Sequence, residues 1–127
     1  MQDHHQLEIW QRGMDYAVDL YKFSAGLPSD ERYNLMSQLR RAATSVPLNI
    51  AEGCGCATNA EFGRFVGYAY RSLKEAVTCL ELCQRLYPAL PMGPISSLID
   101  EGDQVSRMTY AFMQRLGPSR LTDSAQD

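Results

Sequence analysis

The chain has 127 residues, of which 45% are hydrophobic and 21% are charged, and its formal net charge is −3. This length and composition are typical of one globular domain with a real core, and the acidic balance argues against a dedicated nucleic-acid-binding protein. No run of 18 apolar residues occurs, and the start has no basic segment followed by an apolar one, so neither a membrane span nor a signal peptide is predicted. Four cysteines in such a chain favour reduced thiols and a cytoplasmic location.

The first predicted helix covers about residues 7–25, after a flexible tail at 1–6. Its apolar residues fall on two nearly opposite sides and leave an arc of only about 100° for charged side chains. One side carries Leu7, Trp10, Met14, Ala17, Val18 and Tyr21, and the other carries Ile9, Tyr16, Leu20 and Phe23. Because large exposed apolar patches usually mark association, we expect one side to face the protein's own core and the other a neighbouring subunit. We assign the side with Ile9, Tyr16, Leu20 and Phe23 to the subunit interface; the alternative is that the rest of the chain covers both sides.

The second predicted helix runs from an N-cap at Ser29 to about Cys54, after a break at residues 26–28. Its apolar side chains fall within an arc of about 120°, and this register continues on both sides of Pro47. A proline inside a helix removes one backbone hydrogen bond and costs about 3 kcal/mol. The unbroken register therefore predicts one long helix with a kink at Pro47.

A polar stripe lies beside the apolar one on this helix, formed by Gln38, Ser45, Asn49 and Glu52. Such a stripe at the edge of a core is typical of three arrangements: a satisfied hydrogen-bond network, a contact between subunits, or solvated surface. The sequence leaves all three open.

The third predicted helix covers about residues 59–86 and begins with a capping box at Thr58 and Glu61. A proline-rich connection at 87–94 leads to a fourth helix over about 95–116, followed by a flexible tail to residue 127. No strand pattern competes with these four helices, and their connections are short. The sequence therefore predicts an all-α fold, an up-down-up-down antiparallel four-helix bundle over residues 7–116.

No catalytic or metal-binding arrangement is predicted. The only histidines, His4 and His5, lie in the tail, and no motif typical of a metalloprotease or phosphate-binding loop occurs. The cysteine pairs 54/56 and 79/83 are separated by about 30 Å along the third helix, which excludes a four-thiolate zinc site within one chain. We interpret Cys79 and Cys83 as core residues, and Cys54 and Cys56 as loop residues that are either structural or reactive. We expect no cofactor and no enzymatic activity.

Four arginines are candidate contacts for an anion or a nucleic acid. Arg40 and Arg41 have no acidic residue within four positions on their own helix, whereas Arg64 and Arg71 belong to a row that is interleaved with glutamates. Arginine suits bidentate contact with phosphate or carboxylate, although a solvated surface is the simpler interpretation of the second pair. The net charge does not favour RNA as a partner.

Several segments carry a resemblance to a known family: Leu-Glu-Ile-Trp-Gln (7–11), Ser-Gln-Leu-Arg-Arg-Ala-Ala (37–43), Val-Pro-Leu-Asn-Ile-Ala-Glu-Gly (46–53) and Glu-Phe-Gly-Arg-Phe (61–65). In this order they resemble the 23S ribosomal RNA intervening-sequence proteins over about residues 7–116. The resemblance implies a four-helix bundle that assembles as a ring-like homopentamer. Distant relatives are accessory subunits of retroelement reverse transcriptases and contact nucleic acid. Many relatives are basic after the third segment, but residues 54–59 carry no charge here, which weakens a nucleic-acid role at this end.

The sequence thus supports two hypotheses for function. The first is a non-catalytic, oligomeric helical scaffold or binding module, with further copies of the chain and an unidentified protein as partners. The alternative is a nucleic-acid-associated accessory protein that binds ribosomal or retroelement-type RNA through its arginines.

Overall fold

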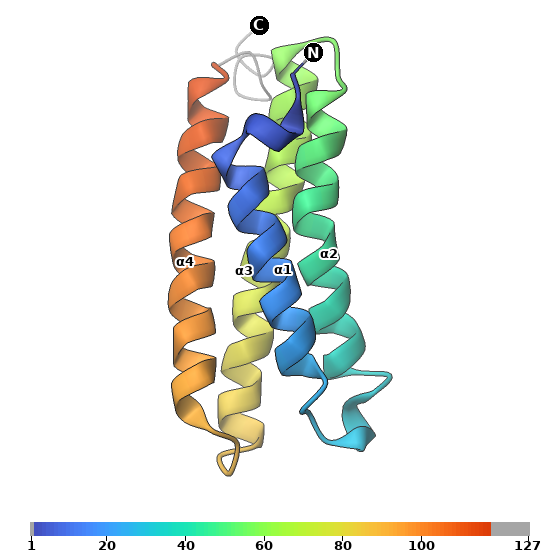
Figure 1. The fold of residues 1–127 in the computed structure, drawn as a ribbon, viewed down its shortest axis with the longest axis vertical. Helices are drawn as coiled ribbons and strands as arrows, with labels where there is room; N and C mark the ends of the chain where they lie inside the picture. The colour runs from blue at the N-terminus through green and yellow to red at the C-terminus, as the bar shows by residue number, and fades with distance from the viewer. Residues whose placement is uncertain (1, 118–127) are drawn as a thin grey trace, which may run out of the picture.

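The computed structural model describes residues 2–117, and within this range it contains helices and no strands. Four long helices form the body: α1 (Glu8–Ser24), α2 (Leu35–Cys54), α3 (Asn59–Leu86) and α4 (Met92–Arg115). Two short 3-10 helices, η1 (His4–Gln6) and η2 (Ser29–Glu31), precede α1 and α2. Successive long helices run in opposite directions and lie side by side around one core (Figure 1). The predicted up-down-up-down four-helix bundle is confirmed.

The core is built from the apolar stripe of each helix. Helix α2 packs against α1 and α3, α3 packs against α4, and α1 closes the bundle against α4 over a smaller area. The largest fully buried aliphatic side chains come from all four helices: Leu20, Leu39, Ile50, Leu73, Leu80 and Ile95. Among the described residues, no helix is both long and apolar enough to span a membrane.

The helix ends follow local capping chemistry. Helix α3 has the predicted bounds, and the Thr58 side chain accepts a hydrogen bond from the backbone N–H of Glu61 at 3.2 Å. Helix α2 begins at Leu35, so the prediction that Ser29 caps it is wrong. The reason is that Glu31 turns inward instead of standing in the first turn: its carboxylate accepts hydrogen bonds from the Leu35 N–H at 3.3 Å and from the Tyr87 hydroxyl.

Helix α2 runs through Pro47 without interruption, as predicted. Pro47 is buried, and Gly13 of α1 lies against it. A Cβ atom at position 13 would stand 3.1 Å from Val46 Cγ1, which is closer than side chains normally pack. The absence of a side chain at Gly13 therefore permits the close approach of α1 to α2 next to the proline.

The chain start differs from the predicted flexible tail. Residues 4–6 form η1, which is capped by the Asp3 side chain, and the Gln2 N–H donates to the Cys54 carbonyl at 3.2 Å. These bonds place the first residues beside the end of α2. The predicted tail beyond Gly117 lies outside the described residues.

Candidate functional site

Helix α1 keeps its two apolar sides in the structure, but the bundle's own core uses the side that we assigned to the subunit interface. Ile9, Tyr16 and Leu20 are buried in the bundle's own core, and Phe23 is partly buried against it. The Tyr16 hydroxyl donates to the Leu98 carbonyl of α4 at 2.8 Å, which satisfies its polar end inside the bundle. The assignment of these four residues to a subunit interface is therefore wrong, because the bundle itself covers them.

The other apolar side of α1 borders an open groove between α1 and α2, which we call the apolar groove. Its volume is about 540 Å³, and it is lined by His4, Trp10, Met14, Ala17, Val18, Tyr21, Lys22, Thr44, Pro47, Leu48 and Ala51. Four of the larger side chains are markedly exposed: Met14 at 39%, Val18 at 47%, Tyr21 at 42% and Leu48 at 66%. Ala17 and Pro47 are buried between them. The apolar groove therefore has small, buried residues at its base and large, exposed apolar side chains along its two sides.

A second hollow of about 430 Å³ continues from the apolar groove and shares Tyr21 and Thr44 with it. We call it the arginine hollow, and its other lining residues are Arg32, Tyr33, Met36, Ser37, Arg40 and Arg41. Arg40 is partly buried and fixed in place, because its Nε donates to Ser24 Oγ at 2.7 Å and its guanidinium carbon lies 4.8 Å from the centre of the Tyr21 ring. None of the three arginines forms a salt bridge within residues 2–117.

The structure brings together only two of the four candidate arginines. Arg40 and Arg41 meet in the arginine hollow, whereas Arg64 and Arg71 lie on α3 and do not line it. Arg64 stands over the Phe65 ring and pairs loosely with Glu61 at 3.8 Å, and Arg71 stands over the Tyr68 ring. Sequence reasoning missed Arg32, which reaches the hollow only because η2 folds back beside the start of α2.

The polar stripe of α2 lies along its contact with α3. The Asn49 amide donates to the carbonyl and to the hydroxyl of Ser45, both at 2.8 Å, and Ser72 Oγ of α3 donates to Ser45 Oγ at 2.9 Å. Gln38 and Glu52, near the ends of the stripe, are exposed. The middle of the stripe is therefore a hydrogen-bond network between helices, and its ends face solvent.

Carboxylates gather where α1 meets α4: Asp19 and Asp15 act on Glu101, and Glu101 and Asp103 both act on the buried Tyr16. We call this surface the acidic edge and define it by these four carboxylates. Burial raises the pKa of Glu101, and the neighbouring charges of Asp19 and Asp15 raise it further, while Arg12 opposes them. Arg12 is engaged elsewhere, since it donates to Gln104 Oε1 at 2.9 Å and contacts Met108 Sδ at 3.6 Å. The edge was missed in the sequence because its members lie on helices more than 80 residues apart.

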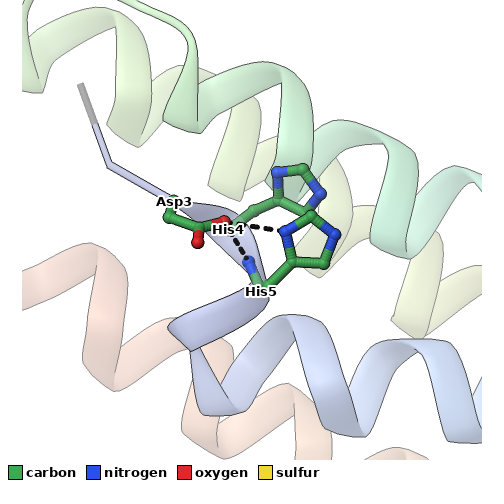
Figure 2. A group of neighbouring side chains, drawn as sticks. All are labelled: Asp3, His4 and His5. Carbon is green, nitrogen blue, oxygen red and sulfur yellow. Dashed lines mark hydrogen bonds and ion pairs between the residues drawn. The ribbon is translucent and has the colours of Figure 1, made fainter.

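Within residues 2–117, Asp3, His4 and His5 form the one group of potential metal ligands, with ligand atoms within 4.8 Å of one another (Figure 2). The Asp3 carboxylate is already engaged, because its Oδ1 lies 2.7 Å from His5 Nδ1 and 3.1 Å from the His5 backbone N. These hydrogen bonds lower the pKa of Asp3. Both imidazole rings pack edge-on against Trp10, with ring centres 4.9 and 5.1 Å away. We assign the group a structural role, in which it closes one end of the apolar groove.

The cysteines have the character of packing residues. Cys54, Cys79 and Cys83 are buried, and Cys56 is partly buried. Burial raises the pKa of all four thiols, that of Cys83 to about 11. Reactive cysteines need an accessible thiolate, which a raised pKa disfavours. The arrangement therefore favours structural roles for Cys54 and Cys56 over reactive ones.

Comparison with known proteins bears on family and fold. A search of curated proteins finds no match. Among solved structures, the bundle is similar to a protein of unknown function from the S23 ribosomal protein family of Bacteroides thetaiotaomicron VPI-5482, with a TM-score of 0.72 and 20% sequence identity. That likeness covers 83% of this chain and 97% of the other, and it supports the fold alone. The family model described as 23S rRNA-intervening sequence protein matches residues 5–111, so the chain belongs to that family, as its motifs predict.

Proposed function

We propose that this protein is a non-catalytic helical scaffold that assembles with copies of itself through the apolar groove. The observation that carries the proposal is the row of exposed Met14, Val18, Tyr21 and Leu48 along the groove. Covering the surface that is still exposed on these side chains stabilises an assembly by about 25 cal/mol for each Å² of apolar area removed from water. Contiguous apolar surface of this kind is typical of association sites.

Two further features support a scaffold. Interfaces between identical subunits are more apolar than transient ones, and the groove walls are aromatic and aliphatic. The family resemblance implies a ring of identical subunits. In the described part of the chain, the carboxylate of the one potential metal-ligand group is already engaged, and the thiols hold their protons, so the chemistry favours binding over catalysis.

The test is the oligomeric state of the purified chain and of two matched variants. Val18→Asp places a charge in the groove, whereas Leu82→Asp places the same charge at a side chain of α3 with similar exposure, 42%. By analytical ultracentrifugation we expect an oligomer for the unchanged protein and for Leu82→Asp, and a monomer for Val18→Asp with unchanged helical content. A monomeric unchanged protein at micromolar concentration would refute the proposal.

A second candidate function is RNA binding as an accessory protein, and the arginine hollow favours it. Three arginines and two tyrosines that have no salt-bridged carboxylate among residues 2–117 suit phosphate and base contact. The net charge of −3 opposes it. Binding to structured RNA should then weaken steeply with salt, and Arg41→Glu should reduce the salt slope by about one. The absence of binding at low salt would exclude this function.

A further inference from the structure

Helix α1 separates two surfaces of opposite charge. On its α2 side lies the arginine hollow, and on its α4 side lies the acidic edge. The arginines of the hollow form no salt bridge within residues 2–117. The carboxylates of the edge form no salt bridge within these residues either. Arg12 is the cation that acts on Glu101, and its guanidinium is shared with Gln104 and Met108. Each surface thus lacks the charge that the other offers.

We infer that, in the assembly proposed above, the arginine hollow of one copy binds the acidic edge of the next copy. The inference rests on the proposed self-association and specifies its partner surface and direction. The contact is heterologous, since two different patches of the same chain meet. A symmetric face-to-face dimer whose two-fold axis passes through the hollow would instead place the arginines of both copies against one another, and juxtaposed like charges are costly.

The positions of the two surfaces suit a closed ring. Each long helix packs against its two neighbours in the order α1, α2, α3, α4, so the four form a roughly square bundle, and the two surfaces occupy the adjacent faces that share α1. Rings of four or five copies need interface planes that meet at roughly 90° or 72°, whereas patches on opposite faces would produce an open filament. The inferred contact therefore places α1 nearest the ring axis.

The heights of the two surfaces along the bundle also agree. Arg40 is anchored at Ser24, and Asp19 lies five residues earlier on the same helix, which corresponds to roughly 8 Å of rise. Rotation about an axis parallel to the helices preserves height, so Asp19 of the next copy would stand about that distance from the level of Arg40. The groove supplies apolar contact area, and the charges fix direction and register.

The test is a charge exchange between exposed positions. Arg32→Glu with Arg41→Glu makes the two exposed arginine positions of the hollow acidic and leaves the packed Arg40 in place, and Asp15→Lys with Asp19→Lys makes the two exposed positions of the edge basic. Each double variant alone should raise the dissociation constant of the assembly by about tenfold or more at low salt, and less at high salt. All four substitutions in one chain should restore assembly, because the exchanged positions of the hollow and of the edge again carry opposite charges.

The control is Arg64→Glu with Arg71→Glu, which changes the net charge equally at positions outside the hollow and should leave assembly intact. If Val18→Asp dissociates the protein but the fourfold variant fails to restore assembly, the inference is overturned while the proposed scaffold stands. A monomeric unchanged protein overturns both. Assembly unaffected by the hollow variant, together with lost RNA binding, also overturns the inference and assigns the arginines to nucleic acid.

Discussion

Gly13 of α1 lies against Pro47 of α2, and a Cβ atom at position 13 would stand 3.9 Å from the proline nitrogen and 3.1 Å from Val46 Cγ1. Pro47 has no N–H, so α2 already lacks one backbone bond at this level. The close contact with α1 holds the helix together where its own hydrogen bonding is weakest. It also sets the floor of the apolar groove, which Pro47 lines.

Gly13→Ala should therefore fail to give the usual benefit of replacing a helical glycine. In an open helix position, alanine stabilises by about 1 kcal/mol relative to glycine. At position 13 the new methyl group presses on Val46, so we expect no gain or a net loss. Gly67→Ala is the matched control, because its nearest neighbour is the flexible Met113 sulfur at 3.5 Å, and it should gain about 1 kcal/mol. Urea denaturation of both variants measures the difference; equal gains would contradict the close packing.

Gly102 of α4 has even less room for a side chain than Gly13. A Cβ atom there would lie 2.6 Å from Val77 Cγ2 and would collide with the Tyr16 hydroxyl. Both neighbours are buried, so neither can move away from the new methyl group without disturbing the core. Gly102→Ala should destabilise the bundle by about 1–3 kcal/mol, the usual range for an overpacked core. Thermal unfolding checks it, and a Tm at or above that of the unchanged protein would show that Tyr16 and Val77 move aside.

Glu31 connects η2 to two helices by hydrogen bonds. Its carboxylate accepts one from the Leu35 N–H at the start of α2 and one from the Tyr87 hydroxyl at the end of α3. Glu31→Ala should cost about 1 kcal/mol, as the loss of a helix cap usually does. The bond to Glu31 raises the pKa of Tyr87 to about 12, with smaller contributions from burial and nearby acidic charge. In the variant, the pKa of Tyr87 should fall toward 10.0, which an absorbance titration detects. An unchanged titration would contradict the contact.

Asp3 offers a pH-dependent prediction with Trp10, the only tryptophan, as the reporter. Hydrogen bonds from His5 lower the pKa of Asp3 below 3.8, so folding of the segment favours the charged carboxylate. The contact should be complete above pH 3.8 and should be lost as the pH falls through the lowered value. Trp10 fluorescence should report that transition, and Asp3→Asn should abolish it without changing global stability. A transition that persists in Asp3→Asn would show that another group controls it.

The sequence predicted the bundle well because its signals are local. Thr58 and Glu61 define the start of α3, and Tyr87 followed by Pro88 defines its end, so both bounds follow from neighbouring residues. The start of α2 was misplaced because Glu31 turns inward, where it accepts hydrogen bonds from the Leu35 N–H and from Tyr87, a residue 56 positions away. Local propensity carries no information about such a partner.

The two-sided character of α1 was also visible in the sequence, but the choice of side was not. Both sides are apolar, and helical periodicity alone does not say which side the core uses. Gly13 could have indicated which side faces the core, because it stands on the same side of α1 as Tyr16 and Leu20 and a glycine there permits close helix packing. The arginine hollow and the acidic edge depend on how α1 lies between α2 and α4, so they appear only when the bundle is assembled.

The bond from the Gln2 N–H to the Cys54 carbonyl has a practical consequence for anyone who expresses this protein. It holds Gln2 beside the end of α2, near the end of the apolar groove that His4 lines. A purification tag or fluorescent reporter fused there would compete with a docking partner for that end of the groove. Labels placed at the connection between α3 and α4, at the opposite pole of the molecule (Figure 1), avoid that competition.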